Sequence, residues 1–319
     1  MILSIITLRG CRSWIKISEQ SKIIITGASG LLGSTLVDYL RRERPDYELF
    51  CLYNTHKIDF NGVKNLKIDL KDSTRVSSLE EINPDLIVHC GALTNISYCE
   101  AHQSESFETN VIGTRNIARL SKKANCKLIY ISTDSIFDGE KGDYSESDVP
   151  NPLHVYGETK VKGEEECLKA NEDSLLLRTN MFGRNFVSNK LSFVDNVIKT
   201  LSEGKEFNGF VDAKFCPLFV GTLSKYIIDL YERDQRGIMN CASSEKLAKF
   251  DFVKLVAKEF GFDENLVKQS SITSVCGDVK RPKDTSLNNS KMLKVLGIKS
   301  TPTMLDMLQS FKKSIENKE

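Results

Sequence analysis

From Lys22 onward, short apolar runs alternate with longer stretches whose apolar residues recur at helical spacing. The apolar runs predict buried strands, and the stretches between them, such as residues 34–44 and 104–125, predict amphipathic helices. Near-continuous apolar strands alternating with helices are typical of a parallel sheet that is covered on both faces. We therefore predict an α/β fold with a Rossmann-type, doubly wound parallel sheet. Its expected strands are KIIIT (22–26), YELFCLY (47–53), NLKIDL (65–70), DLIVHC (85–90) and KLIYIST (127–133).

The alternation becomes less regular after residue 185, where helical stretches are separated by longer loops. We predict a dinucleotide-binding domain over residues 21–185. Residues 186–319 are predicted to form mainly a smaller C-terminal substrate-binding lobe, with some elements returning to the sheet. Residues 1–20 carry an apolar run followed by basic residues, whereas a signal peptide has its positive charge first. They are interpreted as an N-terminal extension of unknown role.

The composition favours a small-molecule partner. The chain has 319 residues, 40% hydrophobic and 27% charged, with a formal net charge of +1, which is ordinary for a globular protein. So small a charge provides no field for nucleic acid or anionic membrane, and no apolar run reaches the ~18 residues of a membrane helix. The nine cysteines contain no C-x-x-C pair, and the four histidines show no metal-ligand spacing. We therefore expect a cytoplasmic protein without a metal site.

A glycine turn, G-x-x-G-x-x-G, joins the first predicted strand to the first predicted helix at Gly27, Gly30 and Gly33. In dinucleotide-binding folds such glycines permit a tight turn, close approach of the backbone to a pyrophosphate, and packing of helix on strand. The N–H groups of the helix N-terminus then face the phosphates. We predict that the three glycines bind a dinucleotide together with Leu31 and Leu32. The alternative is a glycine-rich turn without a ligand.

The end of the second strand is expected to contact the adenosine ribose, about twenty residues after the glycines. The residues there, YNTHK, include no carboxylate that could accept from a ribose 2′-hydroxyl. Asn54 and Lys57 are suited instead to a 2′-phosphate, so we predict NADPH as the cofactor, with NADH as the alternative. Asp69 is expected either to bind the adenine amino group or to cap a helix. The predicted cofactor contacts also include Leu70 and Ala92.

Tyr156 and Lys160 stand four residues apart in PLHVYGETKVKGEEE, where a helix is predicted. Side chains at this spacing project from one helix face. A neighbouring ammonium lowers the pKa of a phenol, and a phenol tuned in this way can exchange a proton with a carbonyl oxygen. The same spacing occurs at Tyr53 and Lys57, but these residues lie at the wrong strand end for hydride chemistry. We therefore predict that Tyr156 and Lys160 form a catalytic pair.

Three longer stretches resemble one family of enzymes. The glycine turn and Tyr-x-x-x-Lys resemble the extended short-chain dehydrogenase/reductases. The chain resembles the dTDP-4-dehydrorhamnose reductase family more specifically, over about residues 22–315. The stretches that carry this resemblance are ISTDSIFDGEKGDYSESDVPNPLHVYGETKVKGEE, LLLRTNMFG and RPKDTSLNNSKMLKVLGI.

The resemblance implies a role for each matching residue. Tyr156 would protonate O4 of the sugar as hydride arrives from the nicotinamide. Lys160 would tune the phenol and hold the nicotinamide ribose. Thr133, together with Ser132, would hydrogen-bond the keto oxygen from the end of the fifth strand. Asn110 matches a helix asparagine that supports the lysine.

The reaction implied is NAD(P)H-dependent reduction of the 4-keto group of a nucleotide-linked 6-deoxy sugar, from dTDP-4-dehydrorhamnose to dTDP-L-rhamnose. Arg281 matches a substrate-lobe arginine, whose planar fork suits a nucleotide diphosphate. A homodimer is a further partner to consider. The family usually has an aromatic residue at the position of Ser135 and an acid at that of Ser97. These two departures bear on the identity of the sugar.

Two alternatives remain open on the sequence. One is an epimerase or dehydratase acting on another nucleotide sugar, although a dehydratase normally has an acid pair beside the threonine and here only Asp134 follows Thr133. The other is a non-catalytic, NADP-binding regulatory subunit, because a relative of these reductases serves the methionine adenosyltransferase complex. The presence of Thr133, Tyr156 and Lys160 favours the reductase.

Overall fold

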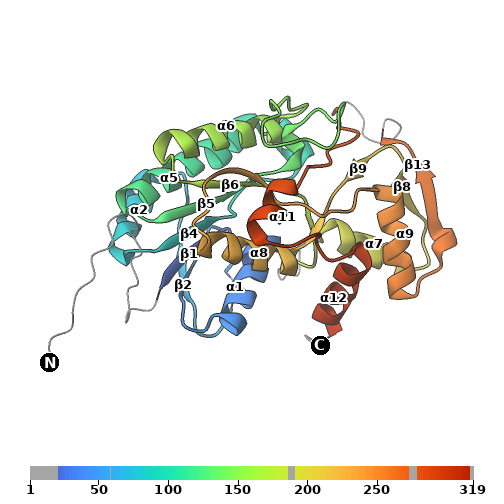
Figure 1. Cartoon of the computed structure of the whole chain (residues 1–319), viewed down its shortest axis with the longest axis horizontal. Coiled ribbons are helices and arrows are strands. Elements are labelled where there is room, and N and C mark those ends of the chain that lie inside the picture. The colour runs from blue at the N-terminus through green and yellow to red at the C-terminus, as the bar shows by residue number, and fades with distance from the viewer. Residues whose placement is uncertain (1–20, 58, 186–190, 273–278, 317–319) are drawn as a thin grey trace.

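The computed structural model describes residues 21–57, 59–185, 191–272 and 279–316. Its centre is a seven-stranded sheet in the order β11-β6-β5-β4-β1-β2-β3, and every pair of neighbouring strands is parallel (Figure 1). The chain winds outward from β1 through β2 to β3, then returns to β4 and winds the other way. The predicted doubly wound fold is confirmed. The strands are β1 (Lys22–Thr26), β2 (Glu48–Tyr53), β3 (Lys64–Lys67), β4 (Leu86–His89), β5 (Lys127–Ile131), β6 (Leu175–Arg178) and β11 (Gly237–Asn240).

Helices cover both faces of the sheet because successive strand residues point to opposite sides. Ile23 and Ile25 pack toward one face and Ile24 toward the other, and all three are fully buried. In Figure 1, α2, α5 and α6 lie on one side of the sheet, and α1 and α8 lie on the other. The near-continuous apolar strands are therefore explained by burial on both faces. The covering helices are α1 (Leu31–Glu43), α2 (Ser73–Ser78), α5 (Gly113–Lys123), α6 (Val155–Ala170) and α8 (Val220–Glu232).

The rest of the chain after residue 185 builds a smaller lobe beside the sheet, although α8 and β11 belong to the sheet layers (Figure 1). Phe182 joins the two parts. Its ring lies 5.1 Å from that of Phe252 and 6.0 Å from that of Phe311, measured between centroids. The sheet and the smaller lobe therefore share one hydrophobic core. The lobe contains α7 (Phe193–Ser202), β8 (Phe207–Phe210), β9 (Lys214–Phe215), β12 (Leu247–Ala248), α9 (Lys249–Phe260), η4 (Glu264–Leu266), β13 (Val267–Ser270) and α12 (Met304–Glu316).

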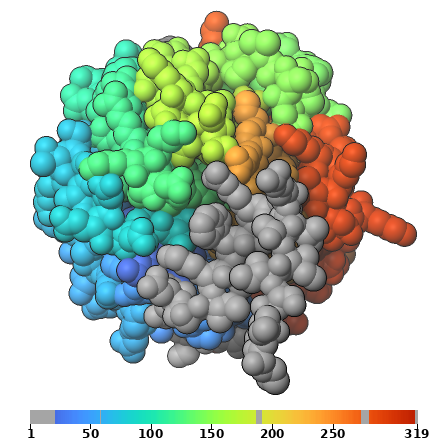
Figure 2. All heavy atoms as spheres, turned by 60° about the vertical axis from the view of Figure 1, so that its left-hand side comes forward, coloured from blue at the N-terminus to red at the C-terminus, as the bar shows by residue number. Residues whose placement is uncertain are grey.

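The loop after β5 is fixed against the C-terminal part of the chain. Tyr144 in this loop donates its backbone N–H to the Ser286 carbonyl oxygen at 2.8 Å, and its own carbonyl accepts from Asn288 N–H at 2.8 Å. In the space-filling view, the green surface of this region meets the red C-terminal part of the chain (Figure 2). The shorter connecting elements are η1 (Leu79–Ile82), α3 (Ile96–Ala101), α4 (Gln103–Phe107), η2 (Glu108–Ile112), η3 (Asp134–Ile136), β7 (Met181–Phe182), β10 (Leu218–Phe219) and α11 (Ser290–Leu296).

Among these described residues, no helix has the length and apolar character needed to cross a membrane. The N-terminal extension predicted over residues 1–20 lies outside the described part of the chain.

Candidate active site

The glycine turn lies where the strand order reverses, between β1 and β4. Gly27 has φ of +61°, and a Cβ on it would lie 2.7 Å from Cα of Gly91, which follows β4. A Cβ on Gly33 would lie 2.3 Å from the Gly27 carbonyl oxygen. Gly30 is the N-cap of α1 and provides no side chain to cap it. Side chains are thus excluded where a pyrophosphate would approach the helix N-terminus, so the turn fits a dinucleotide.

The residues after Gly30 contribute backbone rather than side chains to this turn. Leu31 and Leu32 begin α1, and Leu32 is buried in the core beneath the turn. Their N–H groups belong to the first turn of the helix, where donors lack intrahelical partners. The predicted role of both leucines in cofactor binding is therefore a role for their backbone.

Asn54 and Lys57 follow β2 and are both exposed. The Lys57 ammonium pairs with Asp59 at 3.0 Å, and this pair raises the pKa of Lys57. Because Asp59 is itself 91% exposed, the pair is a solvated one and is easily exchanged for another anion. Both residues are thus accessible to a ribose phosphate at this end of the sheet.

Asp69 is not a helix cap, which was one of its two predicted roles. The carboxylate of Asp72 caps α2, accepting from Thr74 N–H and Arg75 N–H. Asp69 accepts from Lys71 N–H at 3.0 Å. The residues next to it lie at the same sheet edge as the glycine turn. A Cβ on Gly91 would lie 3.0 Å from Cδ1 of Leu70, and the partly buried Ala92 follows Gly91.

His89, at the end of β4, links the glycine turn to the predicted catalytic region. Gly91 N–H donates to Thr26 Oγ1 at 3.0 Å, and Thr26 Oγ1 lies 2.6 Å from Nδ1 of His89. His89 Nε2 lies 3.0 Å from Thr114 Oγ1, which donates to the Asn110 carbonyl oxygen at 2.6 Å. Burial, assisted by the charge of Lys160, lowers the pKa of His89 to about 3. The ring is therefore neutral. Because the Thr114 hydroxyl donates to Asn110, it accepts from His89, which places the ring proton on Nε2.

Lys160 is buried and held by groups of β5. Its ammonium donates to the Ile131 carbonyl oxygen at 2.8 Å and lies 4.0 Å from the centroid of the Tyr130 ring. Burial lowers the pKa of Lys160 to about 8. The ammonium thus remains mainly charged at neutral pH, at the carboxyl edge of the sheet.

Tyr156 lies beside Thr133 rather than in contact with a charge that would ionise it. Burial raises the pKa of the Tyr156 phenol, and a hydrogen bond with the Thr133 side chain offsets only part of the rise. The prediction that Lys160 would lower this pKa is therefore wrong, because the low-dielectric surroundings outweigh other influences on the phenol. A raised pKa keeps Tyr156 protonated, which is the state that a proton donor requires.

Asn110 lies in a π-helical turn, η2, and holds two elements together. Its side-chain oxygen accepts from Leu93 N–H at 2.8 Å, and its amide donates to the Leu93 carbonyl at 2.9 Å and to Thr159 Oγ1 at 3.0 Å. Thr159 is the neighbour of Lys160 on α6. Asn110 therefore fixes the loop after β4 against the helix of Tyr156, and its effect on Lys160 is indirect.

Ser132 is engaged by a buried ion pair that the sequence did not reveal. Its hydroxyl donates to Glu164 Oε1 at 2.6 Å, and Glu164 also binds Arg178 Nη2 at 2.7 Å. All three residues are at least 96% buried. Charged residues are usually exposed, so nothing in KGEEE or LLLRTN marked Glu164 and Arg178 as partners. Ser132 thus anchors β5 to α6, and because its single hydroxyl proton is directed at Glu164, the structure does not support its predicted hydrogen bond to the keto oxygen.

Asp134 joins the three stretches that carry the family resemblance. Its carboxylate accepts from Thr285 Oγ1 at 2.6 Å, from Asn180 Nδ2 at 2.8 Å and from Thr133 Oγ1 at 3.2 Å. Burial raises its pKa, and these donors oppose the rise. Asp134 thereby fixes Thr133 relative to the C-terminal lobe that contains Arg281.

Arg281 approaches α6 from the C-terminal lobe. It lies close enough to His154 for its charge to lower the pKa of that histidine, in addition to the larger effect of burial. Among the described residues, the buried Nε of Arg281 has no hydrogen-bond partner. The structure therefore brings Thr133, Tyr156 and Arg281 to one region between the two lobes.

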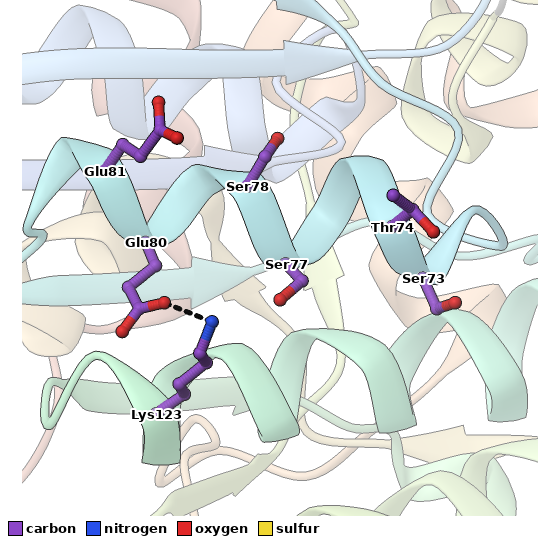
Figure 3. A pocket seen from close by; sticks show the side chains of 7 residues that line it. All are labelled: Ser73, Thr74, Ser77, Ser78, Glu80, Glu81 and Lys123. Carbon is purple, nitrogen blue, oxygen red and sulfur yellow. Dashed lines mark ion pairs between the residues drawn. The ribbon is translucent and has the colours of Figure 1, made fainter.

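A surface hollow elsewhere on the molecule does not belong to this region. Figure 3 shows its lining residues on α2, η1 and α5, where hydroxyl side chains follow α2 and one ion pair joins Glu80 to Lys123. None of these side chains is shared with the site described above. The hollow has no unpaired buried group and lies on the outer side of the helices. We assign it no ligand.

A family model described as RmlD substrate binding domain matches residues 21–315. The chain belongs to this family. The predicted relationship to dTDP-4-dehydrorhamnose reductases is thereby confirmed. The matched residues include both the sheet and the smaller lobe. The family's chemistry is that of NAD(P)H-dependent oxidoreductases.

Curated relatives of this RmlD family member include both enzymes and a subunit of another enzyme. The chain is 30% identical over 288 residues to the probable low-salt glycan biosynthesis reductase Agl14 of Haloferax volcanii, covering 89% of this chain and 95% of that protein. It is also 30% identical over 292 residues to methionine adenosyltransferase 2 subunit beta of Danio rerio, covering 88% and 87%.

A solved structure of similar fold is that of dTDP-4-dehydrorhamnose reductase from Bacillus anthracis, in complex with NADP. It superposes with a TM-score of 0.82 at 26% identity, covering 93% of this chain and all of that one. This similarity extends over the sheet and the smaller lobe.

Proposed function

We propose that the protein uses NADPH, with NADH as the alternative, to reduce the 4-keto group of dTDP-4-dehydrorhamnose or a closely related nucleotide-linked 6-deoxy sugar. The observation that supports this most is the burial of Thr133, Tyr156 and Lys160 together at the carboxyl edge of the sheet, near the glycine turn. Family membership and the NADP complex of the Bacillus relative support the reaction class and the cofactor.

Each residue contributes one step or one constraint. Tyr156 is the acid, because burial keeps its phenol protonated until it passes the proton to O4 of the sugar. Thr133, whose hydroxyl donates to Asp134 in the structure, would turn this O–H to the keto oxygen and direct that oxygen at the phenol. Lys160 keeps a positive charge beside the nicotinamide ribose, and Asn110 holds the α6 helix in place. When bound, the reduced nicotinamide supplies hydride to C4, so hydride and proton together convert the ketone to an alcohol.

Cofactor selection is proposed to lie at the end of β2. Lys57 would exchange Asp59 for the 2′-phosphate of NADPH, with Asn54 as a neutral donor. Asp69, Leu70 and Ala92 would surround the adenine and the adjacent ribose. The glycine turn, from Gly27 to Gly33, would bind the pyrophosphate through backbone N–H groups.

The direct test is the loss of 340 nm absorbance when purified protein and NADPH meet dTDP-4-keto-6-deoxy sugars, followed by identification of the product. Reduction at C4 is expected. Turnover of another nucleotide sugar without net oxidation of NADPH would favour an epimerase or dehydratase.

A regulatory subunit is the second candidate, since relatives named methionine adenosyltransferase 2 subunit beta match most of the chain. A regulatory role predicts that the protein binds NADPH but reduces no keto sugar. Co-purification with a methionine adenosyltransferase catalytic subunit from the host would then decide for it.

A further inference from the structure

Two buried N–H groups have no hydrogen-bond partner among the described residues, and the charge of one residue acts on the pKa of the other. They are Nε2 of His154, at the start of α6, and Nε of Arg281, from the C-terminal lobe. His154 is only 3% exposed. More than nine in ten buried polar groups in proteins have a hydrogen-bond partner. Two such unpaired donors on the same side of α6 as Tyr156 and the C-terminal lobe therefore indicate an acceptor that a ligand brings.

The state of the His154 ring follows from its position at the helix terminus. His154 is the N-cap of α6, and its Nδ1 accepts from Gly157 N–H at 3.0 Å. Burial and the charge of Arg281 lower the pKa of His154, and Glu100, which accepts from Val155 N–H at 2.7 Å, acts in the opposite direction. The ring is therefore neutral with its proton on Nε2. This N–H points away from the helix that Nδ1 caps.

The donors lie beside the proposed proton donor. The His154 and Tyr156 rings are nearly parallel, at 20°, with centroids 6.0 Å apart. Arg281 belongs to the segment that Thr285 fixes to Asp134 at 2.6 Å, and its charge acts on His154. His154 thus places one unpaired donor beside the phenol that would face the sugar carbonyl, and Arg281 provides a second donor from the other lobe.

We propose that His154 is a substrate-positioning residue, which donates its Nε2–H, together with Nε–H of Arg281, to an oxygen of the nucleotide sugar. This inference rests on the proposed function. A neutral N–H beside a permanent cation suits an oxygen with partial or full negative charge. Such an oxygen is present both in the sugar hydroxyls and in the phosphate attached to the sugar. Binding there would hold the sugar in line with Tyr156.

His154→Asn separates this role from helix capping. Asparagine is a good N-cap and can still accept from Gly157 N–H, but its shorter side chain does not carry an N–H to the position of Nε2. We expect dTDP-glucose, used as a stable probe, to bind about three- to tenfold more weakly by calorimetry, the effect of one lost hydrogen bond. The affinity for NADPH and the melting temperature should stay at their wild-type values. The matched control is His102→Asn, at an exposed histidine.

A second measurement identifies the oxygen. If His154→Asn weakens dTDP as much as dTDP-glucose, the acceptor belongs to the diphosphate. If only dTDP-glucose is weakened, it belongs to the sugar. Because both donors serve one oxygen, the loss in His154→Asn/Arg281→Ala should be smaller than the sum of the two single losses in binding free energy.

Wild-type affinity of His154→Asn for both probes would overturn the proposal and leave His154 as a cap only. This result is distinct from failure of the proposed function. A wild-type protein that binds dTDP-glucose but reduces no keto sugar contradicts the reduction, while the variant still tests the contact. A wild-type protein that binds neither dTDP nor dTDP-glucose contradicts both.

Discussion

The Thr285 hydroxyl donates a 2.6 Å hydrogen bond to the buried carboxylate of Asp134, 151 positions earlier in the chain. This contact joins the loop after β5, which contains Thr133, to the segment that contains Arg281. Because Asp134 is only 1% exposed, water cannot readily replace a lost donor. The relative position of the proposed catalytic and substrate-binding residues thus depends on this pair.

Thr285→Val should therefore destabilise the protein. Valine keeps the shape of threonine but leaves the carboxylate with one donor fewer, and hydrogen bonds to charged groups contribute roughly 1.5–3 kcal/mol. We expect the free energy of unfolding in urea to fall by about that amount. The exposed Thr74→Val should change it by no more than about 0.5 kcal/mol. Equal stability of the two variants would show that Asp134 finds another donor.

Tyr156→Phe tests the proposed acid. The variant keeps the buried ring but removes the proton that would reach O4, so kcat should fall by roughly the 10²–10⁴-fold assigned to general acid catalysis. Binding of NADPH, measured by fluorescence, should persist. Tyr39→Phe, at a partly buried tyrosine of α1, is the matched control. Unchanged kcat in Tyr156→Phe would remove the phenol from the mechanism.

The pH dependence of cofactor binding tests Lys160. Burial lowers its pKa to about 8, so the ammonium is charged at pH 7 and loses its proton as the pH rises through that value. A neutral amine attracts the cofactor less, and we expect the NADPH affinity of the wild type to fall between pH 7 and pH 9.5. Lys160→Met should bind more weakly at pH 7 and show a flatter profile. Lys162→Met, at an exposed position on the same helix, should follow the wild type; a parallel profile for Lys160→Met would contradict the assignment.

The parts of this site that could be predicted are those encoded by short motifs. Gly27 and Gly33 are constrained by their own turn, and Tyr156 and Lys160 by the spacing of one helix, so neighbouring residues are enough to indicate them. The alternation of apolar strands and helices predicted the sheet in the same way. The strand predicted at 65–70 is observed as β3 (Lys64–Lys67), because Asp69 and Leu70 turn toward the next helix.

The parts that could not be predicted depend on contacts between distant residues. Glu164 and Arg178 are buried only because each neutralises the other across α6 and β6. The Lys160 ammonium lies on Tyr130 and Ile131, 29 or 30 positions away, and this placement could not be read from its spacing to Tyr156. The pKa of Tyr156 likewise follows from burial by the assembled lobes rather than from its helix neighbour.

Lys57→Ala tests cofactor selection. Lys57 is exposed and paired only with the solvated Asp59 among the described residues, so its loss should not affect folding. If its ammonium binds the 2′-phosphate, the affinity for NADPH should fall roughly tenfold, about 1.4 kcal/mol, while the affinity for NADH stays constant. Fluorescence titration with both cofactors measures this. Equal losses for the two cofactors would mean that the lysine does not contact the phosphate, and tighter NADH binding by the wild type would reverse the predicted preference.

His89 should make the fold sensitive to acid. Burial lowers its pKa from 6.5 to about 3 in the folded protein, so between these values the unfolded chain binds one proton more. The free energy of unfolding then decreases as the pH falls from 6.5, by up to about 1.4 kcal/mol per pH unit from this residue. His89→Gln cannot take up that proton and should flatten the decrease in urea unfolding measured from pH 7 to pH 4. His102→Gln, at an exposed histidine, is the control. If the curves of His89→Gln and the wild type run parallel, His89 takes up a proton in the folded state. The neutral ring that joins Thr26 to Thr114 by hydrogen bonds would then not persist.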